Sequence, residues 1–397
     1  MTRTSWPAVW TAIAAGVVAA AYVGKLPPAI PLLRAEFGLS LIGAGWVNSI
    51  FNTLAVCTAA FVGVLAGRYG ALRFCGAGLA TMLLGGALGA AAHSEALLFA
   101  SRILEGGGFI AISVSAPALI VAACAPRERN LTLGLWASYL PVGSGLTILA
   151  SPYLLGAIGW RGLWLAIVLL TLVCAVALWR SRGSYRTAPA RPPTLANTLA
   201  ALNQSGPWWL ATAFACYSLM YYALAVWMPT FLMQERGASI AQAAALTALL
   251  IGCNAAGNLI GGWLMHRAAP RGHVISLAFL AMAACSCGIF STAAPDALRL
   301  SLCAVFMLAG GMIPACILSG GQLYARDATQ ISSIQGLIVQ IAQLGPFIGP
   351  PLVAAVVSAA GNWEAALGVL LAAAALGTLF GQLAFRAERA LPPRSHA

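Results

Sequence analysis

The sequence is poor in charged residues, and it contains no long polar segment of the kind that forms a soluble domain. Only 8% of its 397 residues are charged, whereas 61% are hydrophobic; soluble domains usually carry roughly 25% charged residues. Acidic residues are the scarcest of the charged types, with nine Asp and Glu in total. A soluble fold could not cover this much apolar surface, so the composition indicates an integral membrane protein.

Several motifs of enzymes and ATP-driven pumps are also absent. The sequence has no G-x-x-x-x-G-K-[ST] nucleotide loop, no H-E-x-x-H motif and no catalytic nucleophile arrangement. Its ten cysteines lie in or beside apolar runs without a CxxC pair, so we interpret them as buried free thiols. We therefore predict that the protein is not an enzyme and that it uses no cofactor or metal.

Apolar runs recur along the whole length, separated by short polar turns. They are about 20 residues long or longer, whereas a membrane β-barrel would show alternating strands of about ten residues. The first run, from Trp6 to about Leu26, is too long for a signal-peptide core and lacks a convincing cleavage site, so we interpret it as a retained helix. We predict an all-α polytopic membrane protein with spans at 6–33, 41–66, 72–92, 96–122, 131–157, 161–180, 207–233, 240–265, 273–294, 297–322, 333–358 and 363–386.

The distribution of Lys and Arg predicts the orientation. Fifteen of the 21 cations fall on the side of the two termini and four fall on the other side. This asymmetry is typical of cytoplasmic loops, so we expect both termini in the cytoplasm, most simply at a bacterial inner (plasma) membrane. The net charge of +12 thus reflects topology rather than a nucleic-acid partner.

The chain divides into two similar halves. The longest polar stretch, 181–206, is rich in Arg, Pro, Ser and Ala and predicts a cytoplasmic linker between bundles 1–180 and 207–397. An internal repeat supports this division, because matching residues recur at an offset of 199. The matches are Gly63 with Gly262, Leu65 with Leu264, Arg68 with Arg267 and Pro152 with Pro351.

Three motifs occur in order at the expected spans. The loop after the second span reads "GVLAGRYGALR", the fourth span contains "RILEGGG" and the sixth opens with "GWRGLW". Together they resemble the major facilitator superfamily over essentially the full length. The resemblance implies twelve helices in two pseudo-symmetric six-helix bundles, and transport by alternating access. It also implies a conformational loop formed by Gly63, Arg68, Gly70 and Arg73, with Arg267 in the second half.

The sequence departs from the family at two places. Glu105 stands where the family usually has glutamine, and Gly67 stands where the loop usually has aspartate. In the fifth span, Ser138, Thr147 and Ser151 replace glycines of the proton-antiporter signature. Small residues persist there, but the glycine pattern does not.

Glu105 is the acidic residue that lies deepest in a predicted span. It lies about 13 Å along the fourth helix, near the middle of the bilayer, and Arg102 shares its helical face. A buried ion pair that only fixes helix packing is one interpretation. The other is proton coupling, in which Glu105 titrates and Arg102 is freed for another partner.

Lys25 is a second cation in a predicted span. If the first helix stops before Pro27, Lys25 lies near a membrane surface and reaches outward. If the helix continues with a kink to about Leu33, Lys25 faces the central cavity and attracts an anionic solute.

Polar and aromatic residues on several spans are candidates for solute binding. Interhelical hydrogen bonding is the structural alternative for the asparagine pairs. Besides Lys25, the candidates are Asn48, Asn52, Tyr139, Tyr217, Tyr221, Trp227, Asn254, Asn258, Gln340 and Gln343.

These observations predict a secondary transporter of a small organic solute, acting as a monomer in a lipid bilayer and coupled to H+ through Glu105. The aromatic, weakly charged candidates favour efflux of an organic or amphipathic compound. The alternatives are uptake of a small organic anion recognised by Lys25 and Arg102, an uncoupled facilitator, and a transporter fold that serves as a sensor. A facilitator would not need Glu105, and the short tail after Arg386 argues against a sensor.

Overall fold

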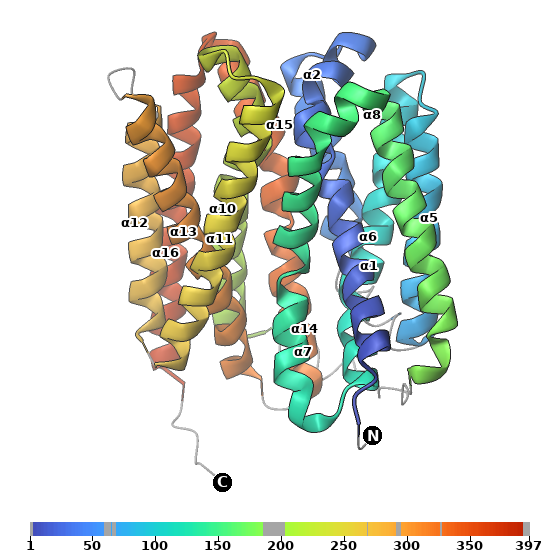
Figure 1. The fold of residues 1–397 in the computed structure, drawn as a ribbon. Coiled ribbons are helices and arrows are strands. Elements are labelled where there is room, and N and C mark those ends of the chain that lie inside the picture. Colours follow the sequence, from blue (N-terminus) through green and yellow to red (C-terminus); the bar gives the residue numbers. More distant parts are fainter. Residues whose placement is uncertain are drawn as a thin grey trace. The chain divides into compact units, whose positions relative to one another are not determined.

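The computed structural model describes residues 3–58, 65, 69–185, 203–267, 269–290, 295–325 and 328–391, and within these ranges the chain is helical without β-strands (Figure 1). The α-helices up to residue 180 are α1 (Trp6–Gly24), α2 (Leu26–Phe37), α3 (Leu41–Ser49), α5 (Ala71–Ala90), α6 (Glu95–Ala123), α7 (Arg129–Ala137) and α8 (Tyr139–Arg180). Those that follow are α10 (Ser205–Arg236), α11 (Ile240–His266), α12 (Arg271–Ile289), α13 (Asp296–Gly321), α14 (Ala328–Ala342), α15 (Leu344–Ala360) and α16 (Ala366–Arg389). Short 3-10 helices are η1 (Ile50–Asn52), η2 (Pro126–Glu128), η3 (Arg182–Ser184), η4 (Gln322–Tyr324) and η5 (Trp363–Ala365).

Eleven helical segments of the described chain are long and apolar enough to cross a membrane. One of them, Pro126–Arg180, has 55 residues, which at about 1.5 Å per residue is far longer than a hydrocarbon core of about 30 Å. It is interrupted at Gly159, whose φ of 67° and ψ of 179° are not helical. The break falls between the predicted fifth and sixth spans, so this segment contains two crossings and the described chain has twelve.

Helix boundaries follow local signals in the sequence. Ser40 caps α3 by accepting a hydrogen bond from Gly43 N at 3.0 Å, and Ser94 caps α6 by accepting from Leu97 N at 3.3 Å. Gly38 ends α2 with a φ of 66°, in the left-handed region that glycine adopts without a steric penalty.

The described chain forms two compact units. The first comprises Met1–Pro192, Leu224–Gly252 and Pro350–Ser358, and the second comprises Pro193–Ala223, Cys253–Gly349 and Ala359–Ala397. Helices α10, α11 and α15 contribute segments to both. Much of the predicted linker at 181–206 lies outside the described residues, so a domain boundary there stays a prediction.

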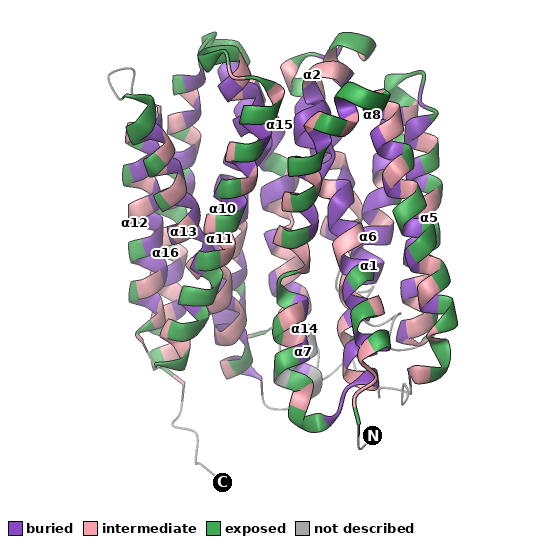
Figure 2. Ribbon diagram, in the orientation of Figure 1, coloured by how far each residue is buried: buried purple, intermediate pink, exposed green. Residues whose placement is uncertain are grey.

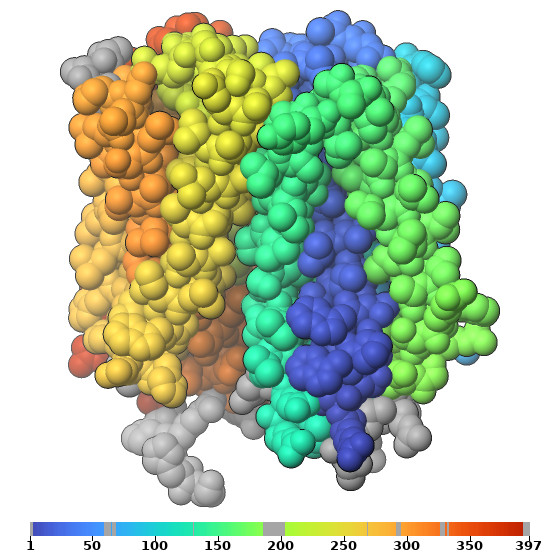
Figure 3. Space-filling view, in the orientation of Figure 1, coloured from blue at the N-terminus to red at the C-terminus, as the bar shows by residue number. Residues whose placement is uncertain are grey.

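In the first unit, α1, α5, α6 and α8 pack against one another. In Figure 3, α1 is dark blue. On one side of it lie α7 and the first part of α8, and on its other side lies the last part of α8. Glycine permits the closest approach. A Cβ atom on Gly106 of α6 would lie 1.7 Å from Phe51 O in η1, so the two backbones touch directly.

Exposed positions recur along α8 (Figure 2), and several of them carry large apolar side chains. Leu165, Leu169 and Val173 are 54%, 61% and 60% exposed, at helical spacing. An exposed apolar stripe on a helix whose opposite face is buried is the surface that contacts lipid.

Candidate functional site

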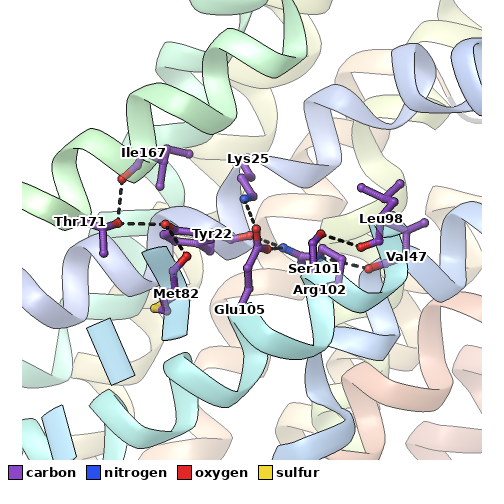
Figure 4. Close-up of polar contacts among 10 residues, drawn as sticks. All are labelled: Tyr22, Lys25, Val47, Met82, Leu98, Ser101, Arg102, Glu105, Ile167 and Thr171. Atoms are coloured by element: carbon purple, nitrogen blue, oxygen red, sulfur yellow. Dashed lines mark hydrogen bonds and ion pairs between the residues drawn. The ribbon is translucent and has the colours of Figure 1, made fainter. Parts of the chain in front are cut away.

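The centre of the first unit holds a buried ionic cluster of Lys25, Arg102 and Glu105 (Figure 4). Lys25 Nζ lies 2.6 Å from Glu105 Oε1, and Arg102 Nη1 lies 2.5 Å from Glu105 Oε2. The three side chains are 0%, 1% and 0% exposed. Glu105 therefore bridges two cations, one on its own helix and one that is 80 positions away in the chain.

The pair on α6 forms as its i, i+3 spacing predicts. Lys25 reaches the same carboxylate because the chain continues from α1 into α2 through Lys25 itself, whose backbone remains near helical geometry with φ −67° and ψ −27°. The structure thus places Lys25 inside the bundle rather than at a membrane surface, which agrees with the continued-helix alternative.

Arg102 is fixed by acceptors on three elements. Besides Glu105, its Nε donates to Val47 O of α3 at 3.2 Å and its Nη1 donates to Tyr22 O of α1 at 3.0 Å. Its guanidinium carbon also lies 4.5 Å from the centre of the Phe51 ring. These contacts hold Arg102 in one orientation.

Lys25 is held mainly by aromatic rings. Its Nζ lies 4.2 Å from the ring centres of Tyr22 and of Trp164, and its hydrogen bond is the one to Glu105. Tyr22 is itself fixed, because its hydroxyl lies 3.1 Å from Met82 O and 3.0 Å from Thr171 Oγ1. The ammonium group therefore lies between two π faces and a single carboxylate.

A glycine face of α5 makes room for the cluster. A Cβ atom on Gly85 would lie 2.9 Å from Glu105 Cγ, and one on Gly86 would lie 2.8 Å from the Tyr22 hydroxyl. One on Gly89 would lie 2.8 Å from Trp164 Nε1. The "GGALG" stretch thus permits the close packing of α5 on α1, α6 and α8.

The cluster does not balance its own charge. Within the described chain, Glu105 is the acidic partner of both cations, so the fully ionised cluster carries one excess positive charge. The Glu36 and Glu388 carboxylates pair elsewhere, with Arg161 and Arg271 respectively. Burying excess charge costs several kcal/mol per ion, so the site favours either an anion or the loss of a proton.

Four other residues predicted for solute binding also lie in the first unit, namely Asn48, Asn52, Tyr139 and Trp227. Asn48 and Asn52 are both buried, and Asn48 Nδ2 has no hydrogen-bond partner among the described residues. Tyr139 stacks on Trp136 and its hydroxyl lies 3.1 Å from Ser113 Oγ. Trp227 is buried and its Nε1 donates to Pro350 O at 3.0 Å.

The second unit contains a polar and aromatic group of its own. Asn254 Nδ2 donates to the Tyr217 hydroxyl and to Met307 O, both at 3.0 Å. The ring of Tyr221 lies 6.0 Å from that of Tyr217. Asn258 is exposed and does not join this group, although it shares a helix with Asn254. Gln340 and Gln343 are half-buried at the end of α14 and in the turn that follows it.

Part of the predicted conformational loop, Gly63 and Arg68, lies outside the described residues. Gly70 precedes α5 with a φ of 89°, a conformation that favours glycine, while Arg73 and Arg267 are exposed. In the second unit Arg271 forms a partly exposed ion pair, in which its Nη1 lies 2.6 Å from Glu388 Oε1.

Sequence reasoning missed Tyr22, Trp164 and Phe51 as parts of the ionic cluster. Tyr22 is three residues before Lys25 and so shares its helical face, which is a signal that spacing alone could have given. Trp164 and Phe51 reach the cluster through tertiary packing, and no local pattern identifies them.

Fold and site together define a polytopic, all-helical membrane transporter, because ionisable groups at such depth mark solute or ion pathways. Residues 11–344 match the family model of the Major Facilitator Superfamily, and the chain belongs to this family. It is 28% identical over 379 residues to the 2-nitroimidazole transporter of Escherichia coli (strain K12). The matched region covers 90% of this chain and 90% of the relative.

Two other relatives are also similar over most of their length. The hexuronate transporter of Bacillus subtilis (strain 168) is 24% identical over 385 residues, with 91% of this chain and 90% of the relative covered. The 4-hydroxybenzoate transporter PcaK of Pseudomonas aeruginosa is 28% identical over 393 residues, with 88% and 85% covered.

The fold resembles the crystal structure of a bacterial homolog to the human lysosomal transporter Spinster, in an inward-facing and occupied conformation. The TM-score is 0.81 at 15% identity, over 96% of each chain. The predicted fold class is confirmed, and the family and its relatives identify the chain as a multi-pass membrane transporter rather than an enzyme.

Proposed function

We propose that the protein is a proton-coupled secondary transporter of a small organic anion, and that coupling depends on Glu105 with Arg102. The observation that carries this proposal is the fully buried carboxylate shared by two cations. The net charge of such a site changes when a proton or an anion binds. The free energy of each charge state then depends on whether water reaches the site.

The excess positive charge supports an anionic solute over a neutral or cationic one. A carboxylate entering the site would offset the buried charge that Glu105 leaves unbalanced. Two relatives are named for hexuronate and 4-hydroxybenzoate, which carry carboxylates. These two points favour uptake of an organic anion that is recognised by Lys25 and Arg102, which is one of the alternatives drawn from the sequence.

Efflux of a weakly charged aromatic compound is the second candidate. Tyr217, Tyr221 and Asn254 form an uncharged group in the second unit, and such a group suits a planar aromatic solute. A relative named for 2-nitroimidazole is in keeping with this candidate.

For the molecule as a whole we propose two bundles, 1–180 and 207–397, that rock about a site near the membrane midplane. Both termini lie in the cytoplasm of a bacterial cell, at its inner membrane, and the monomer is the working unit. The excess of arginine on the side of the termini supports this orientation.

The test compares Glu105→Gln with wild type in proteoliposomes under an imposed pH gradient. Labelled 4-hydroxybenzoate, glucuronate and 2-nitroimidazole serve as probe solutes. We expect the wild type to accumulate at least one of the two carboxylates and Glu105→Gln to lose gradient-driven accumulation. Glu95→Gln is the matched control, because Glu95 is an exposed glutamate at the start of the same helix.

A folded Glu105→Gln protein that retains full gradient-driven accumulation contradicts coupling through Glu105. Accumulation of 2-nitroimidazole alone, without either carboxylate, contradicts the anionic solute and favours the second candidate.

A further inference from the structure

Lys25 is the only lysine in the sequence, and the other 20 basic residues of the 21 are arginine. It is fully buried at the centre of the first unit. Arginine remains protonated at every pH a protein encounters, whereas a buried lysine releases its proton readily. A chain that otherwise uses arginine thus places a cation that can become neutral in the buried ionic cluster of its first unit.

Arg102 and Lys25 differ in how firmly they are held. Arg102 donates to two backbone carbonyls as well as to Glu105, so it is a fixed partner of the carboxylate. Among the described residues, the hydrogen bond of Lys25 is the one to Glu105. The faces of the Tyr22 and Trp164 rings also lie beside its ammonium group.

Few ionisable groups surround Lys25. Of the described elements packed around it, α6 presents Glu105 and, behind it, Arg102. Helix α1 presents the Tyr22 ring, whose hydroxyl is bonded to Met82 O and Thr171. Helix α8 presents the Trp164 ring, and α5 faces the cluster with glycines. Within the described chain, Lys25 is therefore the group whose neutralisation removes the excess charge while leaving the Arg102–Glu105 pair intact.

We infer that Lys25 is the group that gains and loses the coupling proton, ionised when an organic anion is bound and neutral when the closed carrier is empty. The inference rests on the proposed function and specifies the proton carrier at the same site. With Glu105 and Arg102 ionised throughout, both the loaded and the empty closed states are then electrically neutral.

The step balances with one proton per monoanion. As the empty site closes, the Lys25 ammonium gives a proton to cavity water, the N–H bond breaks and its electron pair stays on nitrogen. When the site loads, the amine takes a proton from water and the new ammonium pairs with the anion. Transport of a monoanion is therefore electroneutral, and no other reactant is needed.

A single lysine makes the test direct. The full chain, labelled with lysine carrying 15N at Nζ and inserted in lipid nanodiscs, gives one side-chain signal whose shift reports ammonium or amine. We expect this signal to change from ammonium to amine as the pH is raised from about 5 to about 9. The lysine-free Lys25→Arg variant confirms the assignment by its loss, and Arg3→Lys adds an exposed reference lysine that remains ammonium over the same range.

A Lys25 signal that remains ammonium throughout this range overturns the inference. Because the titration uses no solute, this outcome is separate from the flux test of the proposed function. Lys25→Arg provides a second measurement: we expect exchange of 4-hydroxybenzoate or glucuronate, whichever the wild type accumulates, without gradient-driven accumulation. Full gradient-driven accumulation by Lys25→Arg, alongside its loss in Glu105→Gln, overturns the inference and leaves the proposed function standing.

Discussion

Replacing each cation of the cluster by methionine should destabilise the protein to very different degrees. Arg102→Met removes one of the two cationic partners of Glu105 and also the donor to Val47 O and Tyr22 O. Each buried carbonyl that loses its donor costs about 1–3 kcal/mol. Lys25→Met likewise removes one cation, and with it the excess charge, but it leaves the Arg102–Glu105 pair and both bonds to the carbonyls intact.

We therefore expect Arg102→Met to reduce the free energy of unfolding by about 2–6 kcal/mol more than Lys25→Met does, from the two carbonyls alone. The assay is reversible unfolding in mixed micelles with increasing SDS, followed by tryptophan fluorescence. Arg73→Met, which removes an exposed arginine from the first turn of α5, controls for the loss of a cation as such. A loss for Lys25→Met that equals or exceeds that for Arg102→Met refutes the reasoning about the two carbonyl bonds.

Two further predictions concern packing and the second unit. Gly106→Ala places a methyl group against Phe51 O and should reduce the yield of monodisperse protein in size-exclusion chromatography. Gly107→Ala is the control, because its methyl group meets only the flexible end of a leucine. Equal yields of the two variants would show that η1 moves aside. Arg271→Gln removes the ion pair with Glu388 between α12 and α16, a partly exposed pair, so we expect a loss of about 1 kcal/mol in the SDS assay. An unchanged midpoint would show that the pair contributes nothing to this interface.

Most of the architecture was predictable because hydropathy is a local property. Each described membrane segment coincides with a predicted span to within several residues, including the break at Gly159 between the fifth and sixth. The Arg102–Glu105 pair was predictable for the same reason, since helical geometry brings residues three apart onto one face.

The environment of Lys25 was not predictable in this way. Its local sequence, with two prolines immediately after Leu26, allowed either a helix end or a continued helix. The choice depends on α6, because Glu105 gives a buried ammonium group a partner that no residue near Lys25 supplies. Asn254 and Asn258 make the same point, because they lie four residues apart on one helix and were predicted to act alike. In the structure Asn254 is bonded to Tyr217, whereas Asn258 is exposed.

The sequence by itself determined the class of protein, its spans and the position of Glu105 along its helix, because apolar length and residue spacing are set along the chain. Tertiary structure alone decided that Lys25 shares this carboxylate and that the cluster has one cation too many. The physical reason is that the free energy of a buried charge depends on partners brought together by folding, here from helices 80 residues apart in the chain.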